Sequence, residues 1–122
     1  MSQFWALLWK VKPGTEDSVK ELFRNYGRPD PIVKDPGGNE KGRLIGTQVF
    51  MRDNTIVRVM EIDGALPDVA AHLGRQPEIQ ELETQLDQYL EQPRDMSDPE
   101  GARKFFMSTM MECILARRED EV

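Results

Sequence analysis

Two residues of this 122-residue chain combine a reactive side chain with a position that could serve a ligand. His72, the single histidine, lies in the stretch AAHLGRQPEI, where a glycine and a proline interrupt a helical pattern. Imidazole titrates near neutral pH, so His72 is the side chain best suited to act as a general base. Arg58 lies within the apolar stretch TIVRVMEI, where it could clamp an anion, with Arg75 and Gln76 as helpers. A base and a cation together can remove a proton and stabilise the anion that forms.

Both residues also have a structural interpretation. His72 suits the end of the helix that stops near Gly74, because a helix C-terminus favours a cation and leaves carbonyl groups free to accept a bond. Arg58 suits an ion pair with Glu112 or Glu61 from the sheet, since a buried charge is rarely left without a partner. The sequence leaves the structural and the chemical interpretations open.

Aromatic and sulfur-containing side chains could form the wall of a site for a flat ligand. Trp5 and Trp9 share one face of the first predicted strand, and indole rings stack well on fused rings. Met60 lies on the same strand face as Arg58, and flexible methionine side chains suit an adaptable wall. The same residues suit an ordinary core or a dimer interface. The candidate substrate-binding residues are therefore Trp5, Trp9, Met60, Arg75 and Gln76.

Composition excludes several classes of function. The net charge is −6 and no basic cluster exceeds two residues, so a nucleic-acid partner is not expected. One histidine, one cysteine and scattered carboxylates give no metal-ligand pattern, and no glycine-rich phosphate loop occurs. Cys113 is expected in the core. With no apolar stretch near the ~20 residues of a membrane span and no basic leader, we expect a cytoplasmic protein without membrane contact, metal or organic cofactor.

The first half of the chain predicts a strand, a helix and a hairpin. Residues 3–11 form an apolar run closed by a Pro-Gly turn, which indicates a buried strand. Residues 15–26 carry apolar side chains at helical spacing behind a threonine cap. Residues 28–42 are rich in proline and glycine and predict a long loop. The strands 43–51 and 55–62 follow, joined by an Asp-Asn turn.

The second half predicts a broken helix, a short helix and a last strand. The helix starts at residue 65, is interrupted between Gly74 and Pro77, and continues to about residue 92. Ser97 and Glu100 have capping-box spacing and begin a helix to about residue 106, and residues 108–120 indicate a strand that fades into a charged tail.

These elements predict one α+β domain over residues 1–122. Strand, helix, strand, strand, helix, strand is the ferredoxin-like βαββαβ order, with helices on one face of a four-stranded antiparallel sheet and an extra short helix before the last strand. The first strand is apolar on both faces, so the second face should also be covered. In a small domain a second copy can cover it, and we therefore expect a homodimer.

Three stretches carry a family resemblance: GRLIGTQVFMRDNTIVRVMEIDG, VAAHLGRQPEIQELETQLDQYLEQPRDMSDPEG and ARKFFMSTMM. They resemble the SchA/CurD-like proteins, which are found in actinobacterial gene clusters for aromatic polyketides such as spore pigments. The likeness covers roughly residues 44–111. The succession of a strand, a short helix containing HL, a proline and a second helix is also similar to the dimeric α+β barrel superfamily, which includes small cofactor-independent monooxygenases and polyketide cyclases.

The resemblance implies a role on a polycyclic, phenolic polyketide. We expect a cofactor-independent monooxygenase, in which His72 removes a proton and Arg58 holds the phenolate or enolate while oxygen reacts. A polyketide cyclase or aromatase that uses the same pocket is the first alternative. A non-catalytic accessory subunit, docked on components of a polyketide synthase, is the second.

Overall fold

The computed structural model describes residues 2–120 and confirms an α+β fold on one antiparallel sheet. The strand order is β2-β3-β4-β1-β5, so β3, β4, β1 and β5 form the ferredoxin-like sheet and β2 is added at one edge. The elements are β1 (Ser2–Lys10), α1 (Glu16–Asn25), β2 (Ile32–Lys34), β3 (Glu40–Arg52), β4 (Thr55–Asp63), α2 (Leu66–Gly74), α3 (Pro77–Asp87), α4 (Pro99–Thr109) and β5 (Met110–Met111).

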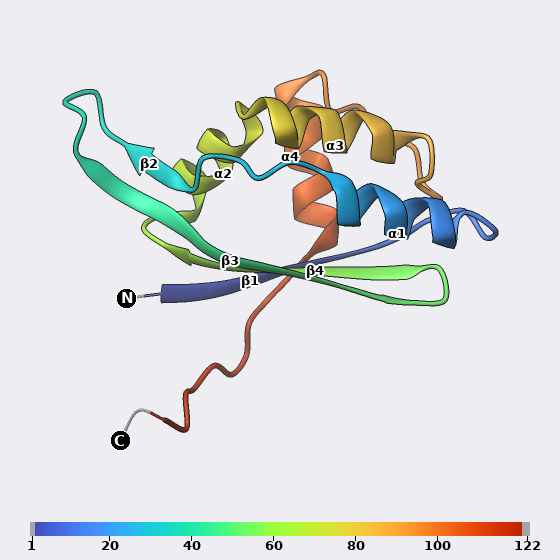
Figure 1. The fold of residues 1–122 in the computed structure, drawn as a ribbon, viewed down its shortest axis with the longest axis horizontal. Helices are drawn as coiled ribbons and strands as arrows, with labels where there is room; N and C mark the ends of the chain where they lie inside the picture. Colours follow the sequence, from blue (N-terminus) through green and yellow to red (C-terminus); the bar gives the residue numbers. More distant parts are fainter. Residues whose placement is uncertain (1, 121–122) are drawn as a thin grey trace.

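The helices lie on one side of the sheet, and the core lies between them and the strands (Figure 1). Side chains alternate between the two faces of a strand, so the period of two in β1 and β4 decides which of them are buried. Leu7 and Trp9 of β1 and Ile56 and Ile62 of β4 face the helices and are buried. Leu8, which lies between the two buried residues of β1, is exposed on the opposite face.

The segment that the sequence predicts as a loop, residues 28–42, is more ordered than expected. Residues 32–34 form β2, which pairs with β3, and β3 itself begins at Glu40. A strand of only three residues gives no clear alternating pattern, and the prolines and glycines around it are typical of a loop. The sequence therefore did not indicate β2. The predicted break between α2 and α3 is confirmed, with Pro77 in the first turn of α3.

The C-terminal part of the chain departs most from expectation. Helix α4 continues to Thr109, and its N-cap is Asp98, whose side chain accepts a hydrogen bond from the Glu100 backbone N–H, rather than Ser97. The last strand, predicted over residues 108–120, contains only Met110 and Met111. The hydrogen bonds of α4 extend two residues into the segment expected to be β-structure.

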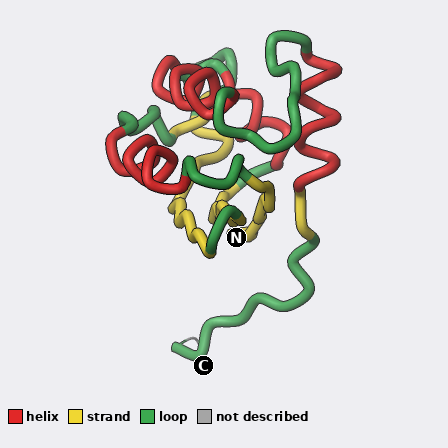
Figure 2. The backbone as a smooth tube through the Cα atoms, turned by 90° about the vertical axis from the view of Figure 1, so that its right-hand side faces the viewer, coloured by secondary structure: helices red, strands yellow, loops and turns green. Residues whose placement is uncertain are grey.

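After β5 the chain leaves the sheet on the side away from the helices, as Figure 2 shows together with the helix layer. Residues 112–120, here called the tail, form no helix or strand. Ile114 and Leu115 are 90% and 67% exposed, and Cys113 is exposed rather than in the core as expected. Among residues 2–120, no helix has the length and apolar character that a bilayer crossing requires.

Candidate functional site

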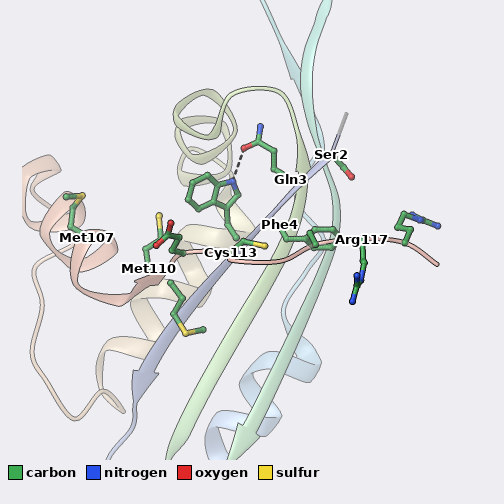
Figure 3. Close-up of a pocket in the computed structure, with 12 residues that line it drawn as sticks. Ser2, Gln3, Phe4, Met107, Met110, Cys113 and Arg117 are labelled. Carbon is green, nitrogen blue, oxygen red and sulfur yellow. Dashed lines mark hydrogen bonds between the residues drawn. The ribbon is translucent and has the colours of Figure 1, made fainter. Parts of the chain in front are cut away.

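A cavity of about 770 Å³ lies between the edge of β1 and the chain that follows α4 (Figure 3). The N-terminal half of β1 supplies one wall, through residues 2–5. The end of α4, β5 and the tail supply the other, through Met107, Met110, Met111, Glu112, Cys113, Ala116, Arg117 and Arg118. We call this space the edge cavity.

The edge cavity exists because β5 is short. Met110 lies opposite Leu7 and Met111 opposite Ala6, and an antiparallel strand continued in this register would bring the tail alongside residues 2–5. Instead the tail diverges from the sheet directly after Met111, so a wedge opens between it and β1. The position of the cavity is therefore set by the residue at which strand pairing stops.

The lining combines flat rings, thioethers and few charges. Trp5 is half-buried, and its indole N–H donates to Gln3 Oε1 at 3.2 Å, which orients the ring. Phe4 and the methionines contribute apolar surface that adapts to the shape of a ligand. Arg117 forms an ion pair with Glu119 at 3.2 Å. The cavity is chemically a binding surface, and its acid-base groups are limited to the Glu112 carboxylate and the Cys113 thiol.

The two tryptophans have different environments. Trp5 lines the edge cavity and also packs against a buried cluster that includes Ile62 and Val69, and its substrate-binding role stays a prediction. Trp9 is 7% exposed and packs in the core against Phe23 and Phe105, with ring centroids 6.5 and 6.2 Å away. Met60 is half-buried beside the second core cluster, which Ile62 and Val69 help to form. The structure thus brings only Trp5 of these residues to the cavity.

His72 and its neighbours fasten the segment before β2 to the helices. The Nε2 atom of His72 lies 2.8 Å from the carbonyl oxygen of Asp30. A carbonyl can only accept, so Nε2 carries the proton and only Nδ1 remains available as a base. Gln76 Oε1 accepts from the Asp30 backbone N–H at 3.3 Å, and Arg75 is exposed. His72 bonds a loop carbonyl here rather than one at the end of its own helix, and its catalytic role stays a prediction.

Arg58 is 6% exposed and faces the helices from the middle of β4. Its Nη1 atom lies 3.5 Å from Glu83 Oε1 on α3. The sequence predicted an acidic partner for Arg58 but named Glu112 or Glu61, which is wrong. Glu61 projects from the opposite face of β4, and Glu112 lies in the tail. The role of Arg58 as an anion clamp stays a prediction.

Sequence reasoning missed Arg94, which completes a buried charge cluster with Arg58 and Glu83. The Arg94 side chain is 4% exposed, and its nitrogens lie 2.7 Å from Glu83 Oε2 and 2.7 Å from Asp87 Oδ1. Its guanidinium also stands 4.3 Å from the Phe105 ring centroid, a cation–π contact. The only signal in the sequence was an arginine in an irregular segment between two helices. The cluster ties β4, α3 and α4 together.

A second cavity, about 600 Å³, lies in the groove between α1 and α3. Its lining includes the carboxylates of Asp17, Glu21, Glu78 and Glu81. Within residues 2–120, no group of three or more histidine, cysteine, aspartate or glutamate side chains is arranged to hold a metal ion. This acidic groove contains none of the predicted site residues.

The fold and the edge cavity define a small ferredoxin-like α+β domain with an apolar site at the sheet edge. The family model of the SchA/CurD like domain matches residues 2–118, and the chain belongs to that family. The chain is 39% identical over 109 residues, 89% of its length, to "Polyketide synthase CurD" of Streptomyces cyaneus, of which it covers 28%. It is equally identical over the same length to the "42.8 kDa protein in whiE locus" of Streptomyces coelicolor, of which it covers 26%.

A third relative, "Protein SchA" of Streptomyces halstedii, is 36% identical over 101 residues, which is 83% of this chain and 25% of the relative. The chain therefore spans about a quarter of the length of the curated relatives it matches. No solved structure matches it significantly.

Proposed function

We propose that this domain takes part in aromatic polyketide biosynthesis by binding a polycyclic, phenolic intermediate in the edge cavity. The observation that carries the proposal is the lining itself, in which Trp5, Phe4 and three methionines surround about 770 Å³ of space. Pockets for small molecules commonly measure about 300 to 1,000 Å³ and are mostly apolar. The relative named as a polyketide synthase, which belongs to the same family, supports the class of ligand.

The arrangement of side chains favours a role that depends on shape. Holding a flexible polyketide in one folded form brings its reacting groups together, and this can accelerate ring closure without a strong base. Neither His72 nor Arg58 lines the edge cavity. The geometry therefore supports an accessory or cyclase role of this kind best, with Trp5 as a stacking surface, Phe4 as apolar surface on the other face of β1 and Glu112 as a carboxylate in the lining.

Cofactor-independent oxygenation stays a prediction, and it requires a site of a different kind. It needs a base that ionises the phenol in a site shielded from water. His72 could meet this demand only through Nδ1 and only for a ligand bound on the helix side of the sheet. We also keep as proposals that the domain is a homodimer, that it contacts components of a polyketide synthase and that it acts in the cytoplasm.

Tryptophan fluorescence tests the binding proposal, because the chain contains only two tryptophans and only Trp5 lines the edge cavity. A polyhydroxyanthraquinone serves as the probe. Trp9→Phe leaves Trp5 as the sole emitter and should show saturable quenching. Trp5→Phe leaves Trp9 as the sole emitter and should show little quenching and an affinity lower by about tenfold. Equal quenching in the two variants, or none in either, would contradict binding in the edge cavity.

The reaction is tested with isotopically labelled molecular oxygen and the full chain. An oxygenase places the label in the product, whereas a cyclase gives an unlabelled cyclised product and an accessory domain gives binding without turnover. If the label appears, His72→Ala should abolish its incorporation, and His72→Gln serves as the control that keeps a donor for Asp30.

A further inference from the structure

Three buried side chains on the helix-covered side of the sheet have a nitrogen atom without a hydrogen-bond partner among residues 2–120. These atoms are Nε1 of Trp9, Nε of Arg58 and Nη1 of Arg94. Trp9 is 7% and Arg58 6% exposed, and the side chain of Arg94 is 4% exposed. A buried N–H group without an acceptor costs stability, so buried donors normally have a partner. Three such donors in one region point to a bound acceptor.

Contacts between neighbouring side chains join the three donors into one cluster. Trp9 lies opposite Ile56 in the pairing of β1 with β4, and Arg58 follows two residues later on the same face of β4. Trp9 and Arg58 are therefore diagonal neighbours, whose Cα atoms are about 7 to 8 Å apart, within reach of long side chains. The Phe105 ring lies 6.2 Å from the Trp9 ring and 4.3 Å from Cζ of Arg94. We call Trp9, Arg58 and Arg94 the donor cluster.

The charges of this region also favour an anion. Arg58 and Arg94 share one mostly buried carboxylate, that of Glu83. Asp87, the second acid bonded to Arg94, is 42% exposed and is therefore largely hydrated. These contacts leave one positive charge in excess in the buried part of the cluster. A buried charge without compensation is costly, and a monovalent anion that accepts from the three donors would balance it.

Water is the alternative occupant, because it donates as well as accepts. Glu83 Oε2 has no hydrogen-bond partner of good geometry, although Arg94 Nη2 lies 2.7 Å away, and a water molecule could donate to it. Water would leave the excess positive charge uncompensated. The donors outnumber this acceptor by three to one, so the cluster favours an anion.

We infer that the donor cluster binds a small monovalent anion of halide size between the sheet and α4. None of its three residues lines the edge cavity or the acidic groove, so the site suits an ion rather than a ring system and is separate from the site of the proposed function. Helix α4 covers the cluster through Phe105 and has no fully buried residue, so local opening of α4 gives an ion access. The anion would connect β1, β4 and the segment before α4.

Bromide is the probe for this site, because it quenches tryptophan on contact and Trp9 would donate to it directly. Trp5→Phe leaves Trp9 as the sole emitter, and sodium bromide should quench it saturably. Sodium gluconate, whose anion is too large for the site, keeps the ionic strength constant. Collision alone should scarcely affect Trp9, since the ring is buried. Trp9→Phe leaves the half-buried Trp5, whose quenching should rise linearly with bromide.

Saturable quenching of Trp9 supports the inference. Its absence, the result expected if the occupant is water, would overturn the inference. Sodium formate is added as a competitor. Displacement of bromide by formate would show that the site also accepts a carboxylate, and bromide binding without displacement would show a halide-selective site.

Variants made in the Trp5→Phe background test which residues hold the anion. Arg94→Gln should raise the bromide Kd about tenfold or more, because a hydrogen bond from a charged donor is lost. Arg94→Lys keeps the charge and should give an intermediate Kd. Arg103→Gln, which changes an exposed arginine on α4, is the matched control and should leave the Kd unchanged. Circular dichroism checks that each variant is folded.

Equal bromide Kd values in the Arg94 variants and the Arg103 control would overturn the assignment of the donor cluster. That result would leave the proposed function standing, because quenching of Trp5 by the anthraquinone reports separately on the edge cavity.

Discussion

The helix-covered side of the sheet and the edge cavity differ in how their polar groups are used. On the covered side, Arg58 and Arg94 are bound to Glu83, and His72 is bound to the chain before β2. At the edge cavity, rings and thioethers surround space that no side chain of the described chain fills. The residue types best suited to catalysis are engaged in holding the fold, while the residues beside the cavity are suited to binding. Reactivity judged from residue type and accessibility judged from structure therefore point to different regions.

The two tryptophans give the largest expected contrast between these regions. Trp9→Ala should lower the free energy of unfolding by about 3 to 5 kcal/mol, because it leaves a hole in the core between Phe23 and Phe105. Trp5→Ala should cost less than half as much, since the ring is only half-buried, and should weaken ligand binding instead. Urea unfolding and ligand titration on both variants measure the contrast. Equal losses of stability would contradict the division into core and cavity.

The buried charge cluster gives the next contrast. Glu83→Ala should destabilise the protein by about 3 kcal/mol, because Arg58 then has no acid within reach in a site where water cannot replace it. Asp87 still pairs with Arg94 and limits the loss. Glu81→Ala, on the exposed side of the same helix, should change stability by less than about 0.5 kcal/mol. Thermal unfolding measures both variants. Equal melting temperatures for Glu83→Ala and Glu81→Ala would contradict the stabilising role of the cluster.

The faces of β1 and β4 could be predicted from the sequence because each residue's face depends on a local period of two. The predicted groupings are confirmed, because Leu7 and Trp9 are buried on one face of β1, and Arg58 is buried on the face of β4 that also carries Ile56 and Ile62. The ferredoxin-like order of strands and helices could also be predicted, because each element is recognised from a local pattern of apolar residues. Local patterns do not say which distant side chains meet, so Glu83 could not be identified as the partner of Arg58.

The edge cavity could not be predicted because it depends on the residue at which β5 stops pairing with β1. Residues 108–120 are apolar and then charged, which suits a strand, and nothing in their pattern shows that pairing ends at Met111. Whether a terminal strand continues depends on the competition between helix α4, the β1 edge and solvent. The same event exposes Cys113, which the local apolar pattern placed in the core.

A smaller effect is expected at His72. Replacement by alanine removes the bond to the Asp30 carbonyl and should lower the free energy of unfolding by about 1 kcal/mol. Quenching of Trp5 by the ligand should be unchanged, since His72 does not line the edge cavity. Hydrogen exchange in residues 28–34 should increase locally. A loss of ligand affinity without a loss of stability would instead connect His72 with the binding site.

The smallest effect concerns the connection between α3 and α4, which joins the buried cluster to the cavity wall. The Ser97 hydroxyl and its backbone N–H both donate to the Asp95 carboxylate and hold its pKa below the ordinary value, and the hydroxyl has the larger effect. A carboxyl with a lowered folded pKa adds stability that is present above the unfolded pKa and is lost as the pH falls through the folded one. Ser97→Ala removes the hydroxyl bond, so the Asp95 pKa should rise toward the ordinary value and this acid-sensitive contribution should shrink. Nuclear magnetic resonance titration of Asp95 measures the change directly, with Ser108→Ala, a change at the exposed end of α4, as the control. An unchanged Asp95 pKa in Ser97→Ala would show that the hydroxyl does not order this connection.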